Sequence, residues 1–536
     1  CHACTVACKS EHEVAVGVNR TWVKYIEKGQ FPHSRRLFSV MRCNHCDDAP
    51  CVEICPVTAL FRRDDGIVDF DNRRCIGCKA CMQACPYDAL YIDPNTHTAA
   101  KCNYCAHRID KGLEPACVIV CPTQAIVSGD LDDPDSHIAQ LKSREAVSVR
   151  KPEKATRPAL YYIEGDRASL DPSAAPPIDS SMWGQQNAGV GHYAKYIEER
   201  VAQQTEASNG KHPLDQLRHL LDLGDRGDGV LNPDKDNPAM TASADAVQSE
   251  VTRRAYDAPN KGVLWGWQVS AYVWTKAISS GVALVAAMAA ASGLAVVTGG
   301  TQWLTLIVSL MFLAITGALL TMDLDQPKRF LYVLLRPQWK SWLVRGAWII
   351  SAFGLALLAW AIAAITTTNQ PPAWVFWFTA VTAALTAVYT AFLFAQAKGR
   401  DFWQSPLLAV HMLVHAIIAG AALFALFLPF FDELSWRAFV VQTLVVSLFA
   451  KLAIDWFELA MTHTTADGKR VARMITRGEY ARLYWPGVVI MGCLIPLTLL
   501  LTTPWWTSPL AGLLALAGLY IAEHIWVRAP QQLPLG

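Results

Sequence analysis

The sequence predicts a chain of two unlike parts: a small α+β domain that holds nearly all the cysteines, and an all-α bundle of about eight transmembrane helices. Fifteen of the 16 cysteines lie before residue 122. Residues 263–536 consist mainly of long runs of Ala, Leu, Val, Trp and Phe. The formal net charge of +1 averages these two parts, whereas the mean hydropathy of +0.20 points to a membrane component.

The cysteines form four groups of recurring spacing. The groups are Cys1, Cys4 and Cys8; Cys43, Cys46, Cys51 and Cys55; Cys75, Cys78, Cys81 and Cys85; and Cys102, Cys105, Cys117 and Cys121. The third reads C-x2-C-x2-C-x3-C-P, the bacterial ferredoxin spacing for a [4Fe–4S] cluster. Three thiolates on one short loop reach three irons, and the fourth cysteine ligates a neighbouring cluster. Disulfide frameworks belong to small secreted domains, and zinc needs only two separated pairs, so both alternatives are disfavoured.

This exchange of the fourth ligand predicts four clusters in two pairs. The expected ligand sets are Cys43, Cys46, Cys51 and Cys85; Cys75, Cys78, Cys81 and Cys55; Cys102, Cys105, Cys117 and Cys8; and Cys1, Cys4 and Cys121. The last set lacks one ligand, which the motif puts three positions before Cys1 in a longer protein. A native [3Fe–4S] cluster is the alternative. We therefore expect a bis-ferredoxin-like iron–sulfur domain over residues 1–127.

The cysteine groups also resemble one another, with CNHC and CNYC, and with VTAL, YDAL or TQAI after each Cys-Pro pair. We expect each Cys-Pro pair to start a short helix that leads to a strand, as in GIVDFD and ALYID. Residues 128–262 lack cysteine and contain breakers such as DPSAAPPIDSS, which predict an extended linker that wraps a partner. Helical patterns occur around 188–205 and 213–223. His192, His212 and His219 are expected on its surface.

The second part contains apolar runs long enough to cross a bilayer. They lie near 268–298, 303–322, 343–365, 374–397, 406–428, 438–460, 485–503 and 509–527. Soluble helices would show an apolar stripe, whereas these runs are apolar on all sides. Residues 263–536 are therefore predicted to form a transmembrane bundle.

Basic residues are distributed unequally between the predicted loops. The side shared with the cysteine domain carries Lys328, Arg329, Arg336, Lys340, Arg345, Lys398, Arg400, Lys469, Arg470, Arg473, Arg477, Arg482 and Arg528. The opposite loops carry only Arg437, beside Asp432 and Glu433. Because basic loops stay in the cytoplasm, we expect an inner-membrane protein with its cysteine domain and both termini in the cytoplasm.

Ionisable residues inside such runs are costly and usually functional. Most of them lie toward the cysteine-domain side: Tyr272, Lys276, Asp323, His411, His415, Lys451, Asp455, Glu458, Glu523 and His524. Structural pairing is the simpler interpretation for any one of them, as for Lys451 with Asp455 at i,i+4. Together they suit a quinone headgroup, whose reduction couples two electrons to two protons.

From this set we expect two functional groups. A quinone and proton site is assigned to Tyr272, Lys276, Asp323, His411 and Glu458. A possible proton path is assigned to the deeper residues His415, Lys451 and Asp455.

Two stretches resemble known families. DLDQPKRFLYVLLRPQWKSWLVRG and the closing EHIWVRAPQQLPLG resemble the NrfD-type membrane subunit of polysulfide reductase. KCNYCAHRIDKGLEPACVIVCPTQA resembles the four-cluster electron-transfer subunit of the same enzymes. The resemblance covers residues 1–127 and 263–536 and implies electron transfer between a membrane quinone pool and a molybdopterin-type catalytic subunit. An obvious Asn/His pair is missing from the first helix, so Tyr272 and Lys276 are not carried over from the family.

The leading hypothesis is a quinone-reactive electron-transfer subunit of a respiratory oxidoreductase. One alternative is a redox-driven proton-translocating subunit, as in relatives of alternative complex III. Another is a non-catalytic membrane anchor for the cluster domain. The chain lacks a pterin-binding region, so the substrate-converting site is expected on another chain.

Overall fold

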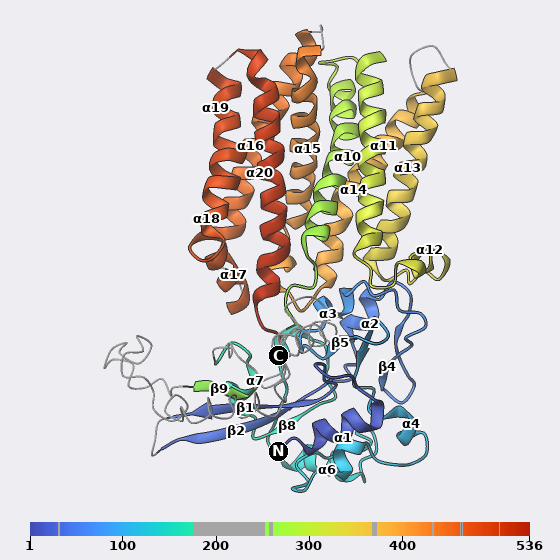
Figure 1. The fold of residues 1–536 in the computed structure, drawn as a ribbon, viewed down its shortest axis with the longest axis vertical. Helices are drawn as coiled ribbons and strands as arrows, with labels where there is room; N and C mark the ends of the chain where they lie inside the picture. Colours follow the sequence, from blue (N-terminus) through green and yellow to red (C-terminus); the bar gives the residue numbers. More distant parts are fainter. Residues whose placement is uncertain are drawn as a thin grey trace, which may run out of the picture.

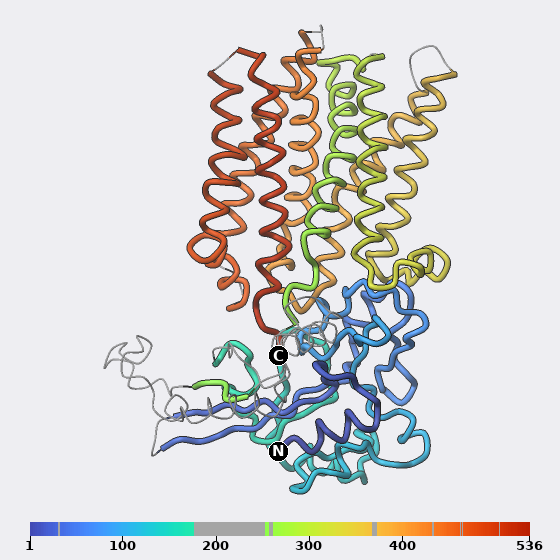
Figure 2. The backbone as a smooth tube through the Cα atoms, viewed as in Figure 1, coloured from blue at the N-terminus to red at the C-terminus, as the bar shows by residue number. Residues whose placement is uncertain are grey.

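The structure is a computed structural model that describes residues 1–29, 33–175, 252–256, 261–297, 299–366, 372–430, 434–460, 463, 465–502 and 504–536. A small α+β domain lies at one end of the molecule and a long helical bundle at the other (Figure 1). Cys1 and Gly536 both lie on the side of the α+β domain (Figure 2). The predicted fold class is confirmed.

The α+β domain is built from short elements that surround the cysteines. Its helices are α1 (Ala3–His12), α2 (Pro50–Ile54), α3 (Ala80–Ala84), α4 (Ala106–Ile109), α5 (Ala116–Ile119), α6 (His137–Arg144) and α7 (Arg167–Leu170). Its strands are β1 (Trp22–Lys28), β2 (Arg35–Met41), β3 (Leu60–Arg62), β4 (Val68–Phe70), β5 (Leu90–Asp93), β6 (Thr98–Lys101), β7 (Val147–Ser148), β8 (Tyr162–Ile163) and β9 (Thr252–Tyr256). They pair as antiparallel sheets β2-β1-β9, β3-β4, β5-β6 and β7-β8.

The Cys-Pro pairs end helices instead of starting them. Helix α2 stops at Cys55 and helix α3 at Cys85, and both cysteines have extended backbones. A residue before proline is disfavoured in the helical region, because the proline ring clashes with its backbone. The short helices predicted after these pairs are therefore wrong. The strands expected in GIVDFD and ALYID are present as β4 and β5.

Part of the polar middle stretch belongs to the folded domain. Residues 128–175 contain α6, β7, β8 and α7, and the Arg150 side chain is buried among them. Its guanidinium donates to the carbonyls of Leu170 and Leu535. The helical patterns at 188–205 and 213–223, and His192, His212 and His219, lie outside the described residues. The predicted boundaries at 127 and 262 stay a prediction.

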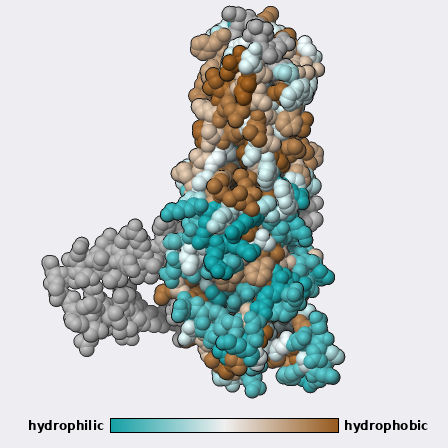
Figure 3. All heavy atoms as spheres, turned by 90° about the vertical axis from the view of Figure 1, so that its right-hand side faces the viewer, coloured by the Kyte–Doolittle hydropathy of each residue, from teal (hydrophilic) through white to brown (hydrophobic). Residues whose placement is uncertain are grey.

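Eight helices of the described chain are long and apolar enough to span a membrane, as predicted. They are α10 (Trp267–Ser292), α11 (Gly299–Met322), α13 (Trp342–Thr366), α14 (Ala373–Gln396), α15 (Leu408–Phe427, continued to Phe430), α16 (Leu434–Ala460), the seventh span (Ala481–Thr502) and α20 (Ser508–Arg528). The seventh span comprises α18 (Ala481–Leu483), a π-helix (Tyr484–Leu494) and α19 (Ile495–Thr502). Helix α10 ends earlier than predicted because Gly293 takes a left-handed cap (φ +66°). Hydrophobic side chains gather over the bundle and hydrophilic ones over the α+β domain (Figure 3).

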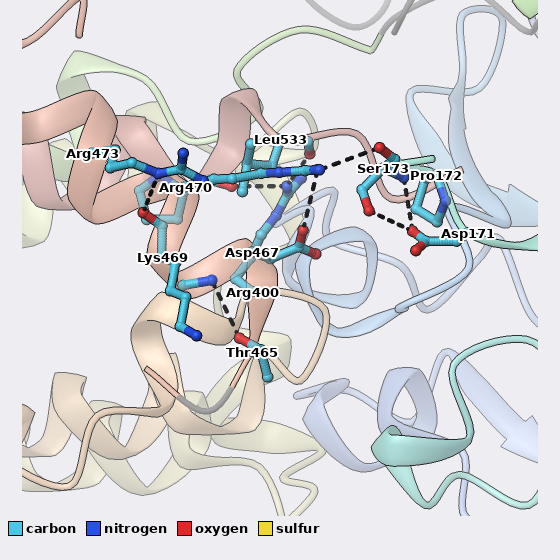
Figure 4. A network of polar contacts seen from close by, with 12 residues as sticks. Asp171, Pro172, Ser173, Arg400, Thr465, Asp467, Lys469, Arg470, Arg473 and Leu533 are labelled. Carbon is cyan, nitrogen blue, oxygen red and sulfur yellow. Dashed lines mark hydrogen bonds and ion pairs between the residues drawn. The ribbon is translucent and has the colours of Figure 1, made fainter. Parts of the chain in front are cut away.

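A short amphipathic helix, α17 (Ala466–Thr476), lies between the sixth and seventh spans and ties the two parts together. Arg470 of α17 donates to the carbonyl of Ser173 at 3.2 Å (Figure 4). In the same network Arg400 donates to the carbonyl of Leu533 at 2.7 Å. A further short helix, α12 (Tyr332–Leu335), follows α11 on the same side of the bundle.

Helices α10 and α15 cross in the middle of the bundle at two glycines. A Cβ on Gly281 would lie 1.8 Å from the Ala416 carbonyl oxygen, and one on Gly420 would lie 2.1 Å from the Gly281 carbonyl oxygen. In membranes, where lipid is as apolar as the helices, such close backbone approach drives association. The crossing fixes the positions of Lys276 on α10 and of both histidines on α15.

We predict that Gly281→Ala lowers the midpoint of thermal unfolding, because the added methyl group must separate the two helices. The free energy of unfolding should fall by about 1–3 kcal/mol, as it does at other overpacked sites. Gly317→Ala on α11 is the matched control, since nothing lies within 4 Å of its added Cβ. That control should keep or raise the unfolding temperature, because alanine favours a helix over glycine. Equal midpoints for the two variants would contradict the close crossing.

Candidate functional site

The structure gathers the cysteines of the α+β domain into compact groups. All sixteen cysteines of the chain lie in described residues, and each is a free thiol. The thiols of Cys55, Cys75, Cys78 and Cys81 line one small cavity. Four thiols around one space are the donor set of a cubane cluster, so the residues present fit a [4Fe–4S] group there.

Three further sets of thiols interact electrostatically. Cys51 lies close to Cys43, Cys46 and Cys85. Cys8 lies close to Cys102, Cys105 and Cys117, and Cys4 lies close to Cys121. These neighbours are the ones that the exchange of fourth ligands expects from the sequence.

The four sets form a continuous line. Neighbouring sets are linked by the pairs Cys4 with Cys117, Cys43 with Cys102, and Cys51 with Cys81. Helices α2 and α3 lie directly below the bundle, whereas α1 lies at the far end of the domain (Figure 1). The set with Cys55 and Cys78 is therefore nearest to the bundle, and the set with Cys1 and Cys4 is farthest from it.

The sequence repeat has a conformational basis. The residue before the second cysteine of three CxxC loops has positive φ: His45 (+43°), Gly77 (+71°) and Tyr104 (+58°). In each of the three Cys-Pro motifs, the residue three positions after the cysteine also has positive φ: Thr58 (+52°), Asp88 (+56°) and Gln124 (+51°). The second turn aims a backbone N–H back at sulfur, since Ala59 donates to Cys55 and Ala125 to Cys121, each at 3.2 Å. Such N–H···S bonds stabilise thiolate charge.

Buried cations lie among the thiols. Arg42 donates to the Cys117 sulfur at 3.3 Å, and Lys101 donates to the Cys43 sulfur at 3.5 Å. Burial raises the pKa of the Cys46 thiol to about 12, although a hydrogen bond with Thr156 opposes the rise. A bound metal would deprotonate these thiols, and the two cations would offset part of the resulting negative charge.

The loop that follows α11 contacts the third cysteine group and fixes its position. Lys79 forms an ion pair with Asp325 at 3.1 Å, and Arg329 donates to the Cys75 carbonyl at 2.9 Å. A Cβ on Gly77 would lie 2.7 Å from the Cβ of Asp325, so only glycine fits there. From the side of α10, the Trp265 indole N–H donates to the Cys78 carbonyl at 3.1 Å. The cavity of the membrane-proximal thiols is thereby fixed against the bundle.

Asp323 connects this thiol set to the interior of the bundle. It interacts electrostatically with Cys78 on one side and with Tyr272 of α10 on the other. Burial raises the pKa of the Asp323 carboxyl to about 7, with Lys79 opposing and Asp325 adding to the rise. A carboxyl group in this state exchanges protons near neutral pH.

Two histidine–carboxylate pairs lie side by side within the bundle. The Nδ1 of His411 bonds Glu458 at 2.7 Å, and the Nδ1 of His415 bonds Glu523 at 2.6 Å. The two imidazole rings are 4.0 Å apart between centroids. All four side chains are at most 3% exposed.

Two lysines adjoin these pairs. Lys451 forms the expected ion pair with Asp455 at 2.7 Å. Lys276 is buried, donates to Thr390 at 2.6 Å and interacts electrostatically with Glu523. The cation also lies 4.8 Å above the ring of Tyr389.

The structure joins the two groups that the sequence analysis kept apart. His415, expected in a deeper proton path, is in ring contact with His411 of the expected quinone site. Glu523 links both of them to Lys276, yet it was left out of the predicted site. The sequence does mark Glu523 as a candidate, because it is an acidic residue within an apolar run. Nothing in the sequence marks Tyr389 or Thr390, which are ordinary residues in an apolar helix.

The chain matches two family models in tandem. Residues 35–131 match the 4Fe–4S dicluster domain, and residues 257–530 match polysulphide reductase, NrfD. The second match covers more than half of the chain and includes all eight spans up to Pro530.

Curated relatives align with the cysteine-rich part. A tetrathionate reductase subunit of Salmonella typhimurium is 46% identical over 32% of this chain and 70% of that protein. A polysulfide reductase polypeptide of Wolinella succinogenes is 38% identical over 32% of this chain and 91% of its own length. The thiosulfate reductase electron transfer subunit of Salmonella typhi is 45% identical over 30% and 84%. The chain therefore belongs to the NrfD family of polysulphide reductase membrane subunits, and an electron-transfer domain for 4Fe–4S clusters is fused to its multi-pass bundle.

Proposed function

We propose that this chain is the quinone-reactive electron-transfer subunit of a respiratory oxidoreductase, relaying electrons between a membrane quinone pool and a separate catalytic subunit of the molybdopterin type. One observation carries this proposal. The line of thiol sets ends at Cys78, beside Asp323 and Tyr272, where the buried polar network of the bundle begins.

The proposed cluster ligands are the four thiol sets. They are Cys43, Cys46, Cys51 and Cys85; Cys55, Cys75, Cys78 and Cys81; Cys8, Cys102, Cys105 and Cys117; and Cys1, Cys4 and Cys121, the last for a [4Fe–4S] or [3Fe–4S] cluster. Bound clusters would supply one-electron transfer. The chain's contribution is to hold the sets in line, to donate N–H groups to sulfur, and to place Arg42 and Lys101 beside the charge.

The proposed quinone site comprises Tyr272, Lys276, Asp323, His411 and Glu458. Asp323 interacts with Cys78 of the membrane-proximal thiol set and with Tyr272, which favours this end of α10 for the headgroup. Reduction of a quinone requires a proton at each oxygen, and oxidation of a quinol requires an acceptor for each. Asp323, the His411–Glu458 pair and Lys276 are groups that can give or take such protons.

The catalytic partner is proposed to dock at the far end of the α+β domain. Cys1 is exposed there, as are the apolar side chains of Val6, Ile119 and Val120. The relatives named above belong by name to tetrathionate, polysulfide and thiosulfate reductases, which supports a partner that converts the substrate.

The cluster domain is proposed to lie on the cytoplasmic face of the inner membrane. The excess of Lys and Arg in the loops on its side supports this orientation. An epitope inserted between α13 and α14, on the opposite side, should be reachable from outside spheroplasts. One inserted beside α12 should become reachable only after lysis, and the reverse pattern would invert the topology.

Redox-driven proton translocation is the second candidate. The observation that favours it is the contact between His411 and His415, which extends the polar network deeper toward Lys451 and Asp455. Such a function requires a membrane potential to form during turnover in proteoliposomes. Turnover without a potential would leave the electron-transfer function alone.

We predict that Cys81→Ser removes one cluster's worth of iron and the corresponding EPR signal, because serine replaces a thiolate ligand. Cys493→Ser is the matched control, since Cys493 lies buried in the seventh span away from the thiol sets. Iron analysis and EPR of the membrane-embedded protein provide the measurement. Unchanged iron in Cys81→Ser would refute the ligand assignment.

We also predict that Lys276→Met and His411→Gln lower quinone-linked turnover by about 100-fold or more, the usual contribution of a positioned acid or base. Cluster EPR signals should stay as in the wild type, because neither residue contacts the thiol sets. His524→Gln on α20 is the control, since its ring contacts Arg528 and not the buried pairs. Wild-type turnover in both test variants would exclude this placement of the quinone.

A further inference from the structure

The two histidine–carboxylate pairs converge on a third carboxylate. One nitrogen from His411, one from His415 and a carboxylate oxygen of Asp455 lie within 4.8 Å of one another. His411 and His415 come from one face of α15, and Asp455 comes from the neighbouring helix α16. All three side chains are buried.

The hydrogen bonds fix which ring nitrogen is available. When the carboxylates are ionised they only accept, and Glu458 and Glu523 then hold the proton on the Nδ1 of each imidazole. The Nε2 of a neutral ring then presents a lone pair. Metal-binding histidines are held in this way, with the other ring N–H donated to a carboxylate.

Two atoms of this triad lack partners. Among the described residues, the Nε2 of His415 and the Oδ1 of Asp455 are buried without a hydrogen bond. A buried polar atom without a partner costs about 1–3 kcal/mol, and two such acceptors within one triad favour an occupant that is a cation or a donor. Neither atom can satisfy the other, because both are acceptors.

The charge balance also favours a cation. Five ionisable groups surround the imidazoles: the carboxylates of Asp455, Glu458 and Glu523, and the ammonium groups of Lys276 and Lys451. Tyr484 and Cys493, the other titratable groups near Asp455, are neutral in their ordinary states. With both imidazoles neutral, three carboxylates face two ammonium groups, and a net buried charge in a membrane is costly, so either a proton on an imidazole or a metal cation would restore the balance.

We propose that His411, His415 and Asp455 form a binding site for one divalent transition-metal ion, with Zn²⁺ as the ion that fits best. Two imidazoles and one carboxylate are a donor set that zinc accepts, with a fourth position open to water. Tetrahedral bonds of about 2.1 Å put ligand atoms about 3.4 Å apart, so a triad whose ligand atoms lie within 4.8 Å of one another must contract by up to about 1.4 Å. The metal would be bound by the two unpartnered acceptors, and it would compete there with a proton.

Neighbouring residues set the strength of binding in opposite directions. Glu523 fixes the His415 ring, so Glu523→Gln should weaken Zn²⁺ binding by about 10–100-fold. Lys451 holds one oxygen of Asp455 and repels a second cation. Lys451→Gln should therefore strengthen binding, which a merely misfolded variant would not do.

The experiment measures Zn²⁺ binding to the full chain with its clusters loaded. Bound metal is counted after equilibrium dialysis, and its ligands are identified by zinc X-ray absorption. The wild type should bind one Zn²⁺ with nitrogen and oxygen ligands at about 2.0–2.2 Å, distinct from sulfur at about 2.3 Å. Binding should be lost in His415→Gln and Asp455→Asn and kept in His524→Gln.

Three results would overturn the proposal. The first is zinc bound through sulfur only, which would mean adventitious binding to cysteines. The second is equal binding in His415→Gln and His524→Gln. The third is no bound zinc in the wild type, which would leave a bridging water as the occupant. Because binding is measured without quinone, failure here is separable from failure of the proposed quinone function.

Discussion

The contact between Gly77 and Asp325 is the constraint on which the two-part architecture depends. The loop of the third cysteine group lies so close to the segment after α11 that no side chain fits between them. Lys79, Asp325 and Arg329 close that contact with an ion pair and a hydrogen bond to a cysteine carbonyl. In a fused chain, the cluster domain could be connected to the bundle by a flexible linker alone. This one instead holds the membrane-proximal thiols at a fixed place above Tyr272.

Much of the fold and of the cysteine groups could be predicted from local features of the sequence. The cysteine spacing predicts ferredoxin-like loops, since a short loop has few ways to surround a cluster, and eight apolar runs predict eight spans because bilayer thickness sets their length. The Cys-Pro helices were mispredicted because the restriction that proline imposes on the residue before it, here Cys55 and Cys85, was not taken into account. Glu523 was missed as a site residue because its link to His415 joins helices far apart in sequence.

The polar network shows how the bundle accommodates ionisable side chains, whose burial in a membrane costs free energy. Each of the two buried histidines forms a pair with a carboxylate from another span, so these polar contacts join different helices. Lys451 and Asp455 form the exception, one turn apart on α16. The π-helix beside them widens the seventh span where Tyr484 approaches Asp455 and Glu458, and π-helical turns are frequent at functional sites. Packing at Gly281 and Gly420 then fixes the spans relative to one another.

Gln531 has a consequence for biosynthesis. Its side chain accepts N–H groups of Leu264 and Trp265 and the amide of Gln83, so it joins the cysteine domain, the start of the first span and the residues after the eighth. A ribosome makes the cysteine domain first and this residue only after all eight spans. The contacts through Gln531 can therefore form only after all eight spans are made, whereas the contact of Gly77 with Asp325 is available once the second span is complete. Docking can therefore begin after the second span and is completed when Gln531 joins it.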